Sequence, residues 1–191
     1  VIQLFVTAIY WKSKRINNFV TSIPSILGIS FLVVMNVALL PYNINIINHL
    51  IIIIGHTVLA AVFFAMILGH WYLNVIQLPI RLLRNSVILL WILLGIRAIW
   101  NCYGILIFEV EDSYGIVQSL GSFLWTYEGF LLSVAIFFGV LVPFVLNGFI
   151  WRTIIIQSTQ SATGLLYVSV VAVIFGDLFY KNYIFQFGLI L

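Results

Sequence analysis

Residues 51–75 read IIIIGHTVLAAVFFAMILGHWYLNV and contain no acidic or basic side chain other than two histidines. An apolar run of this length predicts a transmembrane helix, because about 20 such residues cross the hydrocarbon core of a bilayer. With its flanks the helix is expected to cover 45–75, about 45 Å, so it must tilt or project beyond a core of about 30 Å. This stretch therefore places the chain among helical membrane proteins.

The composition extends that conclusion to the whole chain. Of the 191 residues, 64% are hydrophobic and only 7% are charged, whereas soluble domains are about a quarter charged. No remaining segment is long enough to form a soluble domain. The net charge of +3 is not clustered, which excludes a nucleic-acid-binding surface. The single cysteine, Cys102, excludes an internal disulfide framework and a cysteine-ligated cluster.

We expect an all-α bundle of about five transmembrane helices forming one domain over 1–191, because helices satisfy their own backbone in lipid. The predicted spans are 19–40, 45–75, 86–108, 120–151 and 162–180. Pro143 predicts a kink in the fourth span. The short segment Glu109–Asp112 is expected to be an acidic loop.

The charged residues predict the topology. With these spans, the basic residues on one side of the membrane are Lys12, Lys14, Arg15, Arg81, Arg84 and Arg152. The other side receives the acidic loop, Asp177 and the lone Lys181. By the positive-inside rule the basic side faces a cytoplasm or an organelle matrix. We therefore expect a prokaryotic plasma (inner) membrane or an organelle inner membrane, with lipid phosphates near the arginines.

Two Gly-His pairs in the second span are the strongest functional signal. Gly55-His56 and Gly69-His70 are fourteen residues apart, so the imidazoles are about 40° apart around the helix and about 21 Å apart along it. Neutral imidazole is a common axial ligand of haem iron, and a glycine beside it would admit a flat macrocycle. An interhelical hydrogen bond would also satisfy each imidazole. His49 is expected to lie at an interface.

This His-x13-His spacing resembles the haem-bearing helices of cytochrome b and, more loosely, the membrane cytochrome b subunits of quinone-linked oxidoreductases. The resemblance covers only Asn45–Val75, and it implies haem b bound by His56 and His70, with quinone as a possible further ligand. The other spans contain no histidine. A second axial ligand would therefore come from another subunit, from Met35 or Met66, or would be absent.

Two charged residues fall inside predicted spans. Arg97 lies near the middle of the third span, where an unpaired arginine costs about 2.5–3.5 kcal/mol on insertion scales. It is expected either to bind a haem propionate or quinone head group, or to pair with Glu128. Glu128 is accordingly a candidate for a proton relay or for that ion pair.

These features leave three interpretations. The first is an electron-transfer subunit of a respiratory complex, which binds haem b and exchanges electrons with quinone. The second is a cofactor-free accessory subunit packed against other membrane subunits, and the third is a small transporter or channel. The chain carries no metalloprotease, phosphate-loop or serine-hydrolase signature, so we expect no catalysis by this chain alone.

Overall fold

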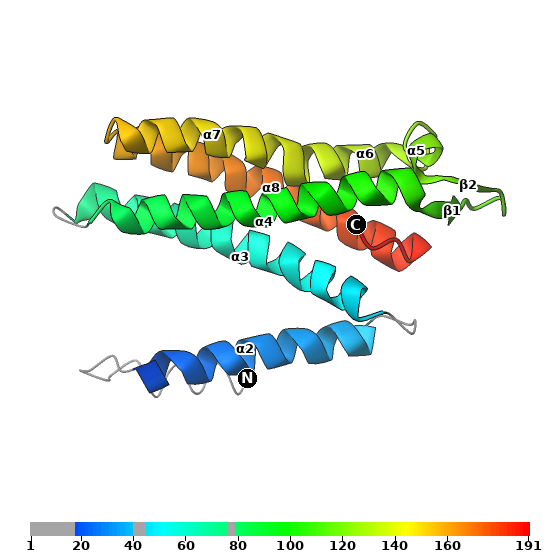
Figure 1. Ribbon diagram of the computed structural model, residues 1–191, viewed down its shortest axis with the longest axis horizontal. Helices are drawn as coiled ribbons and strands as arrows, with labels where there is room; N and C mark the ends of the chain where they lie inside the picture. The colour runs from blue at the N-terminus through cyan, green and yellow to red at the C-terminus, as the bar shows by residue number, and fades with distance from the viewer. Residues whose placement is uncertain (1–17, 40–44, 76–78) are drawn as a thin grey trace. The chain divides into compact units, whose positions relative to one another are not determined.

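The computed structural model describes residues 18–39, 45–75 and 79–191. Helices α2 (Asn18–Leu39), α3 (Ile46–Asn74) and α4 (Arg81–Ile107) are followed by a short hairpin of β1 (Glu109–Glu111) and β2 (Val117–Ser119). The rest is helical, as Figure 1 shows: α5 (Leu120–Phe123), α6 (Phe130–Ile136), the π-helical turn η1 (Phe137–Leu141), α7 (Val142–Ile155) and α8 (Thr159–Phe187). The predicted all-α architecture is confirmed.

Four of the described helical segments are long and apolar enough to cross a membrane, which makes the chain an integral membrane protein. They are Ile46–Asn74, Arg81–Ile107, Phe130–Ile155 and Thr159–Phe187. The remaining predicted span, 19–40, coincides with α2, whose described apolar part is Ile26–Met35.

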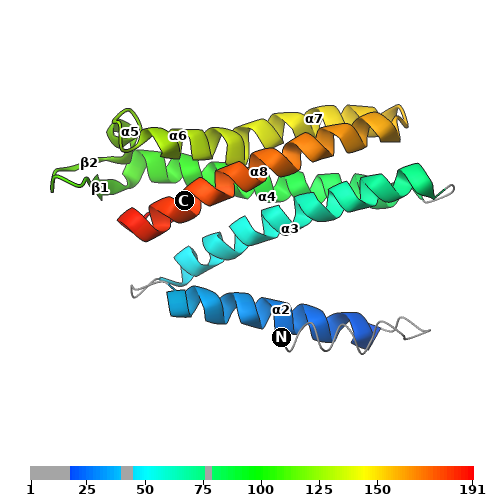
Figure 2. The ribbon, with the colours of Figure 1, turned by 180° about the vertical axis from the view of Figure 1, so that it is seen from behind.

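The chain divides into two compact units, Val1–His49 and Leu50–Leu191. In the second unit α8 packs along α6, η1 and α7, and α4 packs against α7 (Figures 1 and 2). α3 contributes to the same apolar core through Val58, Val62 and Ala65. These side chains are almost fully buried, so α3 from Leu50 onward is a packed member of this bundle.

The two ends of the second unit carry different charges. α4 begins and α7 ends at one end, where α4 carries Arg81 and Arg84 and the last turn of α7 carries Arg152. We call this the basic end. The β1–β2 hairpin lies at the opposite end in both views. Arg81, Arg84 and Arg152 are therefore at the opposite end of the unit from the hairpin, and Lys12, Lys14 and Arg15 lie outside the described residues.

The fourth predicted span begins later than its apolar pattern indicates. Instead of one helix from 120, the chain forms α5, turns, and starts the long helix at Phe130. A Cβ on Gly129 would lie 1.8 Å from the carbonyl oxygen of Phe123, so the turn needs a residue without a side chain there. The hydroxyl of Thr126 also accepts a hydrogen bond from the amide of Gly129 at 3.1 Å.

The long fourth helix is interrupted where the kink was predicted, but through a π-helical turn. η1 directly precedes α7, and Pro143 occupies the first turn of α7. A proline within a helix removes one hydrogen bond and crowds the preceding turn, and a wider π turn accommodates that. At η1 the backbone meets α8 closely, because a Cβ on Gly176 would lie 2.1 Å from Gly139 Cα.

The predicted acidic loop is a β-hairpin in which Glu109 pairs with Ser119 and Glu111 with Val117. Asp112 holds the turn, because its Oδ1 accepts hydrogen bonds from the amides of Tyr114 and Ile116, each at 2.9 Å. Glu109 and Glu111 are exposed on this short element, whereas Asp112 is partly buried.

The last predicted span also continues beyond its expected end at 180, since α8 reaches Phe187. Gly188 then adopts a left-handed conformation with φ of 67°, as is usual at a helix C-terminus. The following residues turn back to α4, where Trp100 Nε1 donates a hydrogen bond to the carbonyl of Ile190 at 3.1 Å.

Candidate functional site

The two glycines of the Gly-His pairs lie on the buried face of α3. A Cβ on Gly55 would lie 2.3 Å from Arg97 Nη1 of α4, and one on Gly69 would lie 2.9 Å from Thr163 Oγ1 of α8. Small residues let membrane helices approach closely. The space beside each glycine is therefore filled by a side chain of a neighbouring helix.

The two histidines lie on a different face of the same helix. Successive helical residues are about 100° apart, so burying the glycines turns the histidines to the edge of the packed face. His56 is half-buried and His70 is exposed. Three exposed residues lie between them at helical spacing: Ala60, Phe63 and Ile67. We call these five residues the histidine stripe.

The two imidazoles have different neighbours. His56 Nδ1 lies 2.9 Å from the carbonyl oxygen of Ile52, one turn earlier in α3. A carbonyl only accepts, so in the neutral ring Nδ1 carries the proton and Nε2 keeps its lone pair. Metal-ligating histidines are commonly held in this way. His70 Nδ1 is 3.5 Å from the hydroxyl of Tyr167 on α8, at the limit of a hydrogen bond.

Arg97 lies at the junction of three helices. Only 6% of it is exposed, and its guanidinium carbon is 4.2 Å from the centre of the Tyr180 ring of α8. The guanidinium also contacts Gly55 of α3. A cation held over an aromatic face contributes about 2 kcal/mol or more when desolvated. Arg97 therefore holds α3 and α8 to α4.

The polar groups around Arg97 are incompletely paired. Asn101 Nδ2 donates to the hydroxyl of Tyr180 at 2.5 Å. The buried atoms Arg97 Nε and Asn101 Oδ1 have no hydrogen-bond partner among the described residues. Such groups cost about 1–3 kcal/mol each. The junction thus keeps one donor and one acceptor unused.

Glu128 lies far from this junction along the fold. It belongs to the turn between α5 and α6, and its carboxylate accepts hydrogen bonds from the amide of Ser113 at 3.2 Å and from the Ser113 hydroxyl. Its backbone carbonyl accepts from the hydroxyl of Tyr183 on α8. Glu128 thereby fastens the hairpin to the helices. Among the described residues Glu128 forms no ion pair with Arg97. The ion pair in that part of the chain joins Lys181 Nζ to Asp177 Oδ2 at 2.6 Å.

Two residues of the junction were not anticipated from the sequence. Asn101 follows Arg97 by four residues on one helix, so their shared face was a usable signal. Tyr180 is distant along the chain, and nothing in the local sequence of α8 distinguishes it from the other aromatic residues. Only the packing of α8 against α4 brings it to Arg97.

The possible ligands for a metal centre are separated. Among the described ranges there is no group of three His, Cys, Asp or Glu side chains placed to hold a metal ion. A haem needs only one or two axial ligands, and His56 suits that role by its fixed ring orientation. Met66 is half-buried on α3 and Met35 is 38% exposed on α2.

Comparison of the chain with protein-family models, with curated proteins and with solved structures finds no match.

Proposed function

We propose that the chain is an electron-transfer subunit of a respiratory membrane complex, in which the histidine stripe of α3 binds haem b against a neighbouring subunit. The observation that supports this most is the orientation of the stripe. Its two imidazoles lie at the edge of the packed core of α3, α4 and α8, where His56 is half-buried with Nε2 available and His70 is exposed. The neighbouring subunit would supply the second axial ligands.

The environment of the stripe supports the need for a partner. Polar side chains within a membrane rarely face hydrocarbon, because each then lacks a hydrogen-bonding partner. His56 uses one ring nitrogen on its own helix, which leaves the other to be satisfied from outside α3. In this role His56 would hold a haem iron through the lone pair of Nε2. Bound haem would supply one-electron transfer, and the two histidines that would hold it are about 21 Å apart along the helix.

The protein's own contribution is to hold α3 in a fixed rotation. Arg97 lies against Gly55 and over Tyr180, so α3 cannot turn about its axis without breaking this junction. The adjacent His56 is thereby kept at the edge of the bundle. Under this proposal Arg97 is a positioning residue. Its Nε is buried without a hydrogen-bond partner among the described residues, so it would be the group that a haem propionate or quinone oxygen could engage.

A cofactor-free accessory subunit is the second candidate, and the packing of the glycines favours it. Arg97 and Thr163 occupy the space beside Gly55 and Gly69 where a macrocycle was expected to approach. On this alternative the histidine stripe is a polar contact with another membrane subunit. The basic end faces a prokaryotic cytoplasm or an organelle matrix in both cases.

One optical measurement distinguishes the two candidate functions. The chain, purified with its native membrane partners, is reduced with dithionite and its absorption spectrum recorded. Electron transfer through haem b predicts a b-type α band. His56→Ala and His70→Ala each remove the absorbance of about one haem, because each removes an axial ligand.

His49→Ala is the matched control, since it removes an imidazole from the same helix outside the stripe. The haem proposal is wrong if the reduced wild-type assembly has no α band, or if all three variants keep the same absorbance. Either result leaves the accessory-subunit interpretation.

A further inference from the structure

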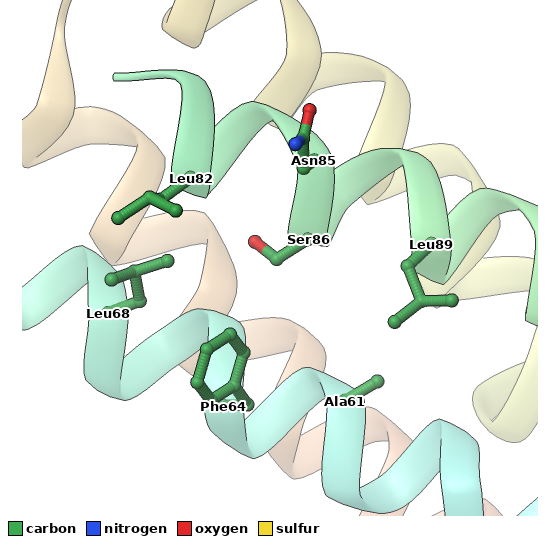
Figure 3. Close-up of a pocket in the computed structure, with 7 residues that line it drawn as sticks. All are labelled: Ala61, Phe64, Leu68, Leu82, Asn85, Ser86 and Leu89. Carbon is green, nitrogen blue, oxygen red and sulfur yellow. The ribbon is translucent and has the colours of Figure 1, made fainter. Parts of the chain in front are cut away.

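A groove of about 280 Å³ lies between α3 and α4. Figure 3 shows its lining residues: Ala61, Phe64 and Leu68 from α3, and Leu82, Asn85, Ser86 and Leu89 from α4. Each wall extends over eight residues, a rise of about 10 Å between its first and last residue. Phe64, Leu82 and Leu89 are each about half exposed, so the groove is open along its side.

The interior of the groove is apolar. Ser86 is the polar residue that points toward α3, and its hydroxyl donates to the carbonyl of Leu83 at 2.8 Å. Asn85 turns its amide away from α3 in the same view. The groove therefore offers hydrocarbon contact without an unsatisfied polar group, which suits a linear chain of methylenes.

Positive charge in the first turns of α4 indicates what kind of head group a ligand of the groove would carry. Arg81 precedes the groove residue Asn85 by four residues and so lies on the same side of α4, and Arg84 lies in the next turn about 60° farther around the helix. Both arginines are exposed, and neither forms an ion pair within the described residues. All five acidic residues of the chain follow Ile107 in sequence, and the hairpin that holds three of them lies at the opposite end of the unit. The positive charges of Arg81 and Arg84 are therefore not neutralised by acidic side chains of the protein.

We propose that this groove is a binding site for an anionic phospholipid of the surrounding membrane. One acyl chain lies between α3 and α4, and the phosphate is held by Arg81 and Arg84. Lipid tails elsewhere in the bilayer are as apolar as the groove. Placing an acyl chain in the groove therefore contributes shape complementarity but little binding free energy. The two arginines select the anionic head group, each by about five-fold. This inference does not depend on the proposed electron-transfer function.

The test counts the lipids that stay bound to the protein. The full chain is reconstituted in vesicles of equal parts phosphatidylglycerol and phosphatidylcholine, extracted in a mild detergent, and analysed by native mass spectrometry. We expect phosphatidylglycerol to be retained preferentially. Replacing both arginines, Arg81→Gln with Arg84→Gln, lowers its retention about twenty-five-fold.

Two matched controls separate a site from general surface effects. Arg152→Gln removes a positive charge from the basic end on α7 and should leave retention unchanged. Leu89→Trp fills the groove from a half-exposed position and should lower retention with both arginines present. Leu106→Trp, on the same helix where the side chain is 83% exposed, should have no effect.

Three outcomes would overturn the proposal. Arg152→Gln could lower retention as much as replacing one groove arginine, which would mean that charge acts without a site. Leu89→Trp could leave retention unchanged, which would mean that the groove is not occupied. Phosphatidylcholine could be retained equally, which would remove the role of the arginines.

Discussion

The contact between η1 and α8 makes a sharp prediction about Gly176. An alanine Cβ at this position would lie 2.1 Å from Gly139 Cα and 2.4 Å from its amide nitrogen, whereas ordinary contact begins at 3.4 Å. Both obstacles are backbone atoms, which cannot rotate away as a side chain does. The two helices must therefore separate by more than about 1 Å, and a gap of that size loses a quarter to a half of the dispersion energy of each facing pair.

We expect Gly176→Ala to lower the free energy of unfolding by about 3 kcal/mol, the upper part of the range for overpacked cores. Gly164→Ala is the matched control on the same helix. Nothing lies within 4 Å of a Cβ built at Gly164, so this change should be neutral or stabilise α8 by up to about 1 kcal/mol, because alanine is the better helix former.

The measurement is the loss of helical circular dichroism as the fraction of sodium dodecyl sulfate in mixed micelles is raised. The midpoint for Gly176→Ala should fall well below that of the wild type, and that of Gly164→Ala should equal or exceed it. Equal midpoints for the two variants would refute the close approach of η1 and α8.

Three further predictions concern the junction and the turn at the hairpin. Gly55→Ala should destabilise by about 1–3 kcal/mol in the same micelle titration, because the guanidinium packed beside it must leave its aromatic partner. Gly95→Ala is the control and should leave stability unchanged, because a Cβ built at Gly95 meets nothing within 4 Å. If Gly55→Ala and Gly95→Ala change stability equally, the packed junction around Arg97 is contradicted. Tyr180→Phe keeps the ring but leaves Asn101 without its acceptor, so it should cost about 1–3 kcal/mol by thermal unfolding in detergent, and an unchanged midpoint would count against the hydrogen bond. Glu128→Gln should speed hydrogen exchange of the hairpin amides by weakening a charge-assisted hydrogen bond, and unaltered exchange would show that the carboxylate does not hold the hairpin.

Hydropathy was sufficient to locate α3, because its apolar run is long and ends in polar residues. It also located most of α4 and α8. It failed between 120 and 130, where apolar residues are interspersed with polar ones and the turn depends on Gly129 and its contact with Phe123. Such a contact between backbone and backbone has no hydropathy signal.

The rotation of α3 was beyond prediction for a related reason. Its residues are apolar on all sides, so no amphipathic pattern shows which face is buried. Sequence spacing places His56 and His70 about 40° apart around the helix. It does not tell whether the histidines or the glycines face the core. That choice follows from the fit of Arg97 against Gly55, which joins two helices.

The π turn in the fourth helix has a consequence for how this helix tolerates changes in length. A π turn holds one residue more than an α turn, so it offsets the two halves of the helix by about 100°. On the N-terminal side of the π turn Leu132 and Ala135 are buried, and on its C-terminal side Asn147 and Ile150 are buried. Deleting one residue from 137–141 would give a more regular helix, yet it would rotate one half away from its contacts. The irregular turn is therefore what keeps both halves in register with the bundle.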